Sequence, residues 1–268
     1  MDYIWLVLVG VVAGLAGGLL GIGGSIVMIP GMNLLFGYHQ HLHQAAAMIV
    51  NFFVVVPAVY QHLRARAVIW PVVRAMAPTA VVAVLAGVAL SETSLFAGRN
   101  EVYLTGLFGL FMAYVGLADL VRLFRGTPTT ETVNPTTVPV WKAALLVGLP
   151  AGVVAGLLGV GGGIMMVPLQ RRILRIPIRM AIANSATAII LLSPVGAFMK
   201  NYAVISGGSY PWWKSLVLAG VLIPTAMCAA FFGGRLTHTL PVKQVRIAFI
   251  LLLFVLAIRM CLRAASAL

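Results

Sequence analysis

Two glycine-rich segments contain the backbone groups best suited to bind a ligand. Residues 18–30 read GLLGIGGSIVMIP and residues 156–168 read GLLGVGGGIMMVP, with nine identities in thirteen positions at an offset of 138. In both copies the glycines interrupt an apolar stretch, where a membrane helix can unwind and free its backbone groups. The helix that restarts after such a break presents unpaired N–H groups and the positive end of its dipole, which bind anions. The spacing therefore predicts a small-anion site built from residues 21–24 and 159–163.

A competing interpretation is that these glycines only let membrane helices pack closely, as small residues do in helical bundles. For a lone GxGG sequence, close packing is the better explanation. Two copies, each followed by apolar residues and by Pro30 or Pro168, favour the binding site.

Polar side chains inside apolar segments are energetically costly, so they are candidates for the same site. Asn33, Asn51, Asn184, Ser185 and Ser193 qualify. Asn and Ser donate hydrogen bonds to an oxyanion without carrying a full charge, which permits release as well as binding; hydrogen bonds between helices are their alternative role. The predicted substrate-binding residues are Gly21, Gly23, Gly24, Ser25, Asn33, Asn51, Gly159, Gly161, Gly162, Gly163, Asn184 and Ser185.

The composition places these residues in an integral membrane protein. Hydrophobic residues make up 62% of the chain, charged residues make up 9%, and the mean hydropathy is +1.06, whereas about a quarter of an ordinary soluble domain is charged. No Asp, Glu, Lys or Arg occurs between Tyr3 and Leu63, a run about three times the roughly 20 residues that one membrane helix needs. The first ten residues contain no Lys or Arg, so we expect a first membrane segment rather than a cleavable signal peptide.

Other residue types exclude several function classes. The net charge of +13 comes from basic residues in short loops between apolar runs, which indicates membrane topology rather than nucleic-acid binding. The only two cysteines, Cys228 and Cys261, lie in apolar segments and suggest neither a disulfide framework nor a metal site. The sequence contains no HExxH, GxSxG or Walker motif and no acidic pair suited to acid-base catalysis. We therefore expect no enzyme, no catalytic residues and no cofactor.

Eight hydrophobic segments divide the chain into two homologous halves of an all-helical fold. Residues 1–125 contain a glycine-broken segment followed by three more, and residues 140–268 repeat that order. Residues 126–139 are rich in Thr and Pro, without apolar periodicity, and form the predicted linker.

A second repeated pattern supports the duplication. The tripeptide Pro-Thr-Ala begins at Pro78 and at Pro224, in the third segment of each half, and Gly87 and Gly233 follow nine residues after each proline. The whole chain is therefore expected to contain two copies of one four-segment unit.

The distribution of Lys and Arg distinguishes parallel from inverted halves. If all eight segments cross fully, the 18 basic residues divide 10 to 8 between the faces; if both glycine-broken segments enter and return on one side, the halves are inverted and the division is 13 to 5. Positive-inside bias favours inverted repeats with glycine-broken, re-entrant first segments. The face with 13 charges is then cytoplasmic, and both termini lie outside an inner or plasma membrane.

The repeated phrases resemble the TauE/SafE family of sulfite exporters, also called the toluene sulfonate uptake permease family. The resemblance covers nearly the whole chain and includes the Ala-Asn-Ser signature at residues 183–185. It implies a permease for small sulfur-containing or organic anions such as sulfite, sulfoacetate or related sulfonates, in either direction. The first half departs from the pattern, with Ala-Ala-Met at residues 46–48, so a polar contact there must come from elsewhere, such as Asn51.

The acidic residues bear on how transport is driven. None of the five lies in the middle of a membrane segment, and Asp119 is the sole candidate for ion coupling; its proximity to Arg122 favours a local ion pair instead. Outward movement of one negative charge across a negative-inside potential releases about 2.3 kcal/mol per 100 mV. Export or facilitated passage by alternating access therefore needs no coupling ion. The expected partners are a small anion and the lipid bilayer, not nucleic acid, and a homo-oligomer is compatible with the sequence.

Two alternatives remain open. His39, His41 and His43 spell HxHxH, a spacing that places imidazoles on one side of an extended strand and can bind Zn or Cu. This loop favours a cation or metal permease. The other alternative is a membrane scaffold subunit that transports nothing, although its loops are too short to form a docking domain.

Overall fold

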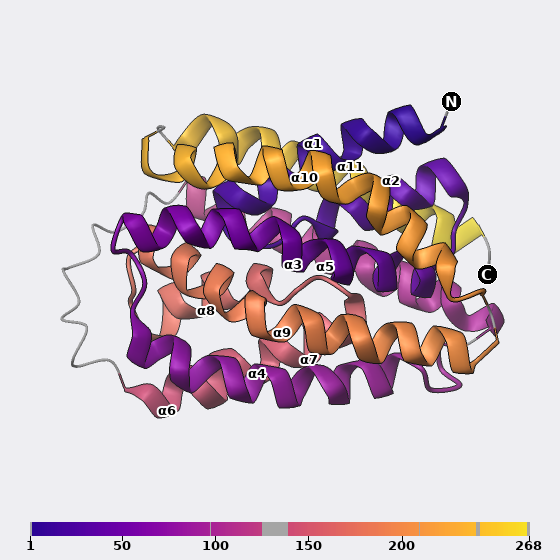
Figure 1. The fold of residues 1–268 in the computed structure, drawn as a ribbon, viewed down its shortest axis with the longest axis horizontal. Helices are drawn as coiled ribbons and strands as arrows, with labels where there is room; N and C mark the ends of the chain where they lie inside the picture. The colour runs from indigo at the N-terminus through magenta and orange to yellow at the C-terminus, as the bar shows by residue number, and fades with distance from the viewer. Residues whose placement is uncertain (1, 97, 125–138, 209, 240–241, 267–268) are drawn as a thin grey trace.

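A computed structural model describes residues 2–96, 98–124, 139–208, 210–239 and 242–266. Within these ranges all regular structure is helical, and the long helices run along the longest axis of the molecule (Figure 1). The predicted all-helical fold class is confirmed. All of the predicted linker except Pro139 lies outside the described residues.

The helices follow the order of the hydrophobic segments. The first half contains α1 (Asp2–Leu20), α2 (Ser25–Phe36), α3 (Gln40–Arg64), α4 (Trp70–Ser91), the short 3-10 turn η1 (Gly98–Asn100) and α5 (Glu101–Phe124). The second half contains α6 (Val140–Lys142), the π-helical turn η3 (Ala143–Gly148) and α7 (Leu149–Leu158), which form one continuous helical stretch, and then α8 (Gly163–Ile173), α9 (Ile178–Ser206), α10 (Trp213–Thr239) and α11 (Val242–Ser266).

Six helical stretches in the described part of the chain are long and apolar enough to cross a membrane. They are Gln40–Arg64, Trp70–Ser91, Glu101–Val121, Val140–Leu158, Ile178–Ser206 and Trp213–Thr237. Large apolar side chains such as Val82, Leu110, Phe198 and Leu251 are exposed on the outer surface of the bundle. Such an apolar surface requires a lipid environment, so the chain is a multi-pass membrane protein.

The two ends of the bundle carry different polar residues. We call the end at which α3 begins the histidine end, because His39, His41 and His43 lie there, and the end that carries Arg171 and Arg172 of α8 the arginine end. Figure 1 shows the start of α1 and the end of α11 at the histidine end, and the start of α6 at the opposite end. The two glycine-interrupted segments, α1–α2 and α6–α8, therefore start from opposite ends of the bundle.

Small residues allow the first helix of each half to pack against the other half. Helix α1 packs along α10, and α7 packs along α4. An added Cβ at Gly14 would overlap the carbonyl oxygen of Ala226, and one at Gly152 would overlap that of Ala80. Gly14 and Gly152 are 138 residues apart, and both alanines end the repeated Pro-Thr-Ala tripeptide. Close backbone contact between small residues holds these helices, and so the glycine segments at their ends, in place.

Candidate functional site

The helices stop at matching glycines in the two repeated phrases. Helix α1 ends at Leu20 and α2 begins at Ser25; α7 ends at Leu158 and α8 begins at Gly163. Gly23 and Gly161, which are 138 residues apart, have φ values of 75° and 70°. Glycine adopts this left-handed conformation without the steric cost that a Cβ imposes. We call residues 21–24 the first break and residues 159–162 the second break.

The two breaks meet in the buried interior. An added Cβ at Gly163 would overlap the carbonyl oxygen of Gly21, so the first residue of α8 touches the first break. Asn51 of α3 lies between the breaks: a Cβ on Gly23 would come within 2.8 Å of Asn51 Oδ1, and one on Gly161 within 2.8 Å of Asn51 Nδ2. Asn51 is fully buried. One amide side chain therefore contacts both halves of the repeated phrase.

Asn51 satisfies the start of α2. Its Oδ1 accepts hydrogen bonds from the backbone N–H of Gly24 at 2.9 Å and of Ser25 at 3.2 Å. Its Nδ2 donates to Ser25 Oγ at 2.7 Å. A helix normally leaves its first N–H groups unpaired, so Asn51 acts as a cap supplied from another helix.

The start of α8 has no such cap. The residue 138 positions after Asn51 is Ile189, whose Cδ1 would lie 2.8 Å from a Cβ on Gly163. An isoleucine cannot accept a hydrogen bond, and no described residue accepts one from the N–H of Gly162, Gly163 or Ile164. These groups are buried. Unpaired N–H groups and the positive end of the α8 dipole therefore face the space between the breaks, which suits an anion.

The other predicted site residues separate into two groups. Ser185 joins the breaks, because its hydroxyl donates to the carbonyl oxygen of Gly21 at 2.8 Å. Asn184 lies away from them: its Oδ1 accepts from the N–H of Ile69 at 2.7 Å, and its Nδ2 donates to Gln170 Oε1 at 3.0 Å. Asn184 thus connects the start of α4 to α8, which is the alternative role predicted for such residues.

Asn33 also lies apart from the breaks, near the histidine end. Its Nδ2 donates to Gln40 Oε1 at 2.7 Å, and its Oδ1 lies 2.6 Å from His43 Nδ1. The remaining predicted glycines, Gly159 and Gly162, form part of the second break, with φ values of 71° and 78°. A Cβ on Gly159 would come within 2.7 Å of Gln44 Cβ.

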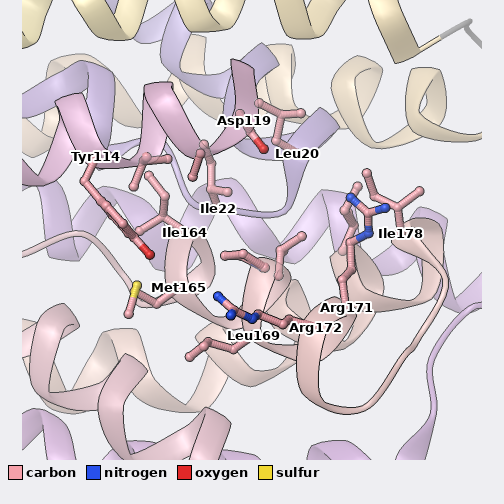
Figure 2. A pocket seen from close by; sticks show the side chains of 15 residues that line it. Leu20, Ile22, Tyr114, Asp119, Ile164, Met165, Leu169, Arg171, Arg172 and Ile178 are labelled. Atoms are coloured by element: carbon pink, nitrogen blue, oxygen red, sulfur yellow. The ribbon is translucent and has the colours of Figure 1, made fainter. Parts of the chain in front are cut away.

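A pocket leads from the arginine end to both breaks. Its cavity volume is about 90 Å³, and it is lined by Ile22 of the first break, by Ile164 of α8, and by Asp119, Arg171 and Arg172. Figure 2 shows Ile22 and Ile164 near one another and the Arg172 guanidinium on the facing side. Arg172 is exposed and Arg171 is half-buried. The sequence analysis counted both arginines only as surface charges, although their place directly after the second repeated phrase was a usable signal.

The predicted alignment of the HxHxH histidines is wrong. His41 and His43 lie inside α3 and His39 precedes it, so successive members are rotated by about 200° around the helix rather than aligned as in a strand. His39 Nδ1 lies 2.8 Å from the hydroxyl oxygen of Tyr210, whereas His41 Nδ1 lies 2.9 Å from Lys200 Nζ. The described residues contain no group of three or more His, Cys, Asp or Glu side chains able to hold a metal ion.

A buried charged cluster at the histidine end was not predicted. Lys200 of α9 is fully buried, and its Nζ donates to Ser91 Oγ at 2.6 Å and to Glu92 Oε1 at 2.8 Å. Burial raises the pKa of the Glu92 carboxyl, but hydrogen bonds from His41 and Lys200 and the charge of Lys200 together lower it to about 2. The cluster joins α3, α4 and α9. Only the isolated Lys200 in an apolar segment was visible in the sequence.

Comparison with known proteins places the chain in a family. Residues 6–260 match the sulfite exporter TauE/SafE family. The chain is similar to the probable membrane transporter protein MamO of Magnetospirillum gryphiswaldense (30% identity, 97% of this chain, 45% of the relative) and of Paramagnetospirillum magneticum (28% identity, 97% and 44%). It therefore spans less than half the length of these two relatives.

A shorter relative is covered almost completely. A probable membrane transporter protein of Haemophilus influenzae is 27% identical over 96% of this chain and 97% of the relative. No solved structure matches the chain. The family match covers nearly all described helices, from α1 into α11, and both glycine breaks. The chain therefore belongs to the sulfite exporter TauE/SafE family.

Proposed function

We propose that the protein is a permease for a small anion, with a sulfur oxyanion or organosulfonate such as sulfite or sulfoacetate as the favoured substrate. One observation carries the proposal: the buried N–H groups at the start of α8 have no described acceptor and lie where both breaks and Asn51 meet. The oxygens of a sulfite or sulfonate group accept such hydrogen bonds. The family description, sulfite exporter, supports the same substrate class.

The pocket at the arginine end supplies the route to this site. Arg171 and Arg172 raise the local concentration of an anion, and the pocket narrows to Ile22 and Ile164 beside the breaks. Its small volume suits a small anion better than a bulky organic substrate. Backbone donors in place of a buried lysine bind the anion without holding it too tightly for release.

The two halves form inverted repeats under this proposal. The α1–α2 and α6–α8 segments enter from opposite ends, and each first helix packs against the third long segment of the other half. The contacts repeat as well: Gly21 lies against Ile182 and Gly159 lies against Gln44, pairs that are each related by an offset of 138. Inverted repeats with discontinuous helices at their interface are the usual basis of alternating access.

The arginine end then faces the cytoplasm, in agreement with the positive-inside rule. Both termini lie on the outer side of an inner or plasma membrane, and the pocket opens inward. Rocking one half against the other would close this pocket and open a route at the histidine end. Because the membrane potential drives anions outward, export is the favoured direction.

Anion flux in proteoliposomes tests the function. Purified protein is reconstituted, labelled sulfoacetate or sulfite is loaded, and valinomycin with a K⁺ gradient sets the potential. Wild type should show flux that follows the potential, and Gly161→Leu should lose at least tenfold, because the side chain would occupy the position of Asn51 and strain a left-handed residue.

Gly220→Leu is the matched control, because nothing lies within 4 Å of an added Cβ at Gly220 of α10. It should keep wild-type flux. Thermal unfolding and size-exclusion profiles establish that both variants fold. Absence of anion flux from wild type, together with metal uptake, would replace this proposal by the cation permease. Absence of any flux would favour the scaffold subunit.

A further inference from the structure

The first two turns of α3 carry buried polar atoms without hydrogen-bond partners. Among the described residues, Gln40 Nε2, His43 Nε2 and both amide atoms of Gln44 have no partner. The three side chains are fully buried. Positions i, i+3 and i+4 share one face of a helix, so these groups lie on the same side of α3. Because buried polar groups are almost always paired, this cluster requires a ligand in some state of the protein.

Asn33 fixes which of these atoms remain available. Its Nδ2 donates to Gln40 Oε1, so the NH₂ group of Gln40 is left as a donor. Its Oδ1 accepts from His43 Nδ1, so the proton of a neutral imidazole lies on Nδ1 and Nε2 keeps its lone pair. The face therefore offers two amide donors, from Gln40 and Gln44, and one site that accepts a proton.

The cluster lies between the second break and the histidine end. Gln44 packs against Gly159, and Asn51 follows two turns later on the same face of α3. Toward the outside, the ring of His39 lies 6.1 Å from that of His43 and 5.3 Å from that of Tyr210, and Lys214 Nζ lies 5.2 Å from the Tyr210 ring centroid. His39 and Tyr210 thus separate the cluster from the histidine end, and Lys214 places a positive charge beside them.

We propose that Gln40, His43 and Gln44 form an outer oxyanion subsite that binds the transported anion together with one proton. Oxygens of the anion accept from the two glutamines, and the proton binds His43 Nε2, either from solvent or as an O–H group of a protonated anion. The subsite presupposes the anion permeation proposed above. It fills when His39 and Tyr210 move apart, and it passes the anion along α3 to the breaks.

The other half shows that the fold does not require these polar residues. The positions 138 residues later are Ile178, Ala181 and Ile182, and both isoleucines line the pocket at the arginine end. The equivalent face is therefore apolar on the inner route. Proton binding belongs to the outer route alone.

The charged and titratable groups around His43 are few. His39 at the start of the same helix and Lys214 of α10 act on it electrostatically, and Tyr210 contacts His39. Helix α2 contributes the amide of Asn33 and contains no charged residue. Because Lys214 repels a second positive charge, a bound anion favours protonation of His43, and the proton and the anion bind cooperatively.

Reversal potentials in proteoliposomes test the subsite. Sulfoacetate is the probe because both of its acidic groups are ionised at neutral pH, so a proton that moves with it must be carried by the protein. One sulfoacetate with one proton carries one net negative charge. The potential at which wild-type flux stops should therefore shift by about 59 mV for each tenfold proton gradient. His43→Gln should keep sulfoacetate flux, with no shift of that potential and no proton movement reported by a trapped pH dye.

His62→Gln is the control, since His62 is a second buried histidine at the opposite end of α3; it should keep the wild-type shift. A wild-type reversal potential that ignores the proton gradient, or a His43→Gln variant that still follows it, would overturn the subsite while leaving anion permeation intact. If His43→Gln does not fold, the wild-type shift alone decides. Loss of all sulfoacetate flux from wild type would instead remove the function on which the subsite depends.

Discussion

The routes from the two breaks to the two ends of the molecule use equivalent positions with opposite chemistry. On the arginine side, Ile178 and Ile182 line an open pocket whose rim carries Arg172. On the histidine side, Gln40 and Gln44 occupy the positions 138 residues earlier and are fully buried. The duplicated backbone therefore sets where an anion can pass, whereas the side chains of each half decide how it is attracted and whether a proton accompanies it.

The breaks themselves differ in the same manner. Asn51 caps α2, but Ile189 at the equivalent position leaves the first N–H groups of α8 without a described acceptor. One helix start is satisfied by the protein, and the other is available to a ligand. The difference predicts that the anion binds mainly to the second half, with Asn51 oriented toward it from the first.

The largest effect is expected from placing the wrong charge between the breaks. Asn51→Asp keeps the acceptor for Gly24 and Ser25 but puts a negative charge beside the anion. Juxtaposed like charges cost several kcal/mol, so sulfoacetate flux should fall at least about a hundredfold while thermal stability changes little. An unchanged flux in this variant would place the anion elsewhere.

Ile189→Asn provides the complementary change, since it gives α8 the kind of cap that α2 has. A net hydrogen bond contributes about 1 kcal/mol, so a cap that competes with the anion should weaken sulfoacetate binding by roughly five- to tenfold. Binding measured by isothermal titration in detergent checks this. Tighter binding in Ile189→Asn would contradict the assignment of the α8 N–H groups as the anion donors.

A smaller effect is expected at the rim of the pocket. Arg172→Gln removes an exposed positive charge that attracts the anion but does not hold it, so KM should rise about two- to fivefold with little change in maximal flux. The difference from wild type should shrink at high ionic strength. Arg179→Gln, an exposed arginine at the same end that does not line the pocket, should behave as wild type.

The smallest effect concerns stability at the histidine end. Because the folded-state pKa of Glu92 is lowered to about 2, its pairing with Lys200 stabilises the fold fully above the unfolded-state pKa of about 4.3 for Glu. That contribution declines as pH falls from there toward 2. Thermal unfolding at pH 6 and pH 3 should show a drop in Tm that is smaller in Glu92→Gln. An equal drop in both proteins would exclude Glu92 as its source.

Much of the fold was predictable from the sequence, because hydropathy and the repeated phrases are local signals. The all-helical membrane fold and the family membership followed from composition and from the GLLGxGG segments. Asn51 was predictable as a candidate because a polar residue in an apolar segment is costly. Its position between the two breaks depends on how α3 packs against both hairpins, and no local pattern encodes that contact.

Other residues were misjudged for similar reasons. Asn184 looked equivalent to Asn51, but its partners are Ile69 and Gln170, which lie far from it in the sequence. The HxHxH spacing was interpreted for a strand, whereas α3 already begins at Gln40 and separates the imidazoles. The burial of Lys200 depends on partners in α3 and at the end of α4, so charge counting alone placed it at a surface.

The central claim is that the start of α8 binds the transported anion. Protein labelled with ¹⁵N-glycine and ¹⁵N-isoleucine, reconstituted in nanodiscs, allows the amide resonances of Gly162, Gly163 and Ile164 to be followed during titration with sulfoacetate. Saturable shifts of these three resonances, reduced in Ile189→Asn and absent for a cationic ligand of similar size, are the predicted result. Sulfoacetate flux through a protein whose Gly162, Gly163 and Ile164 amides do not respond at saturating sulfoacetate would contradict the account.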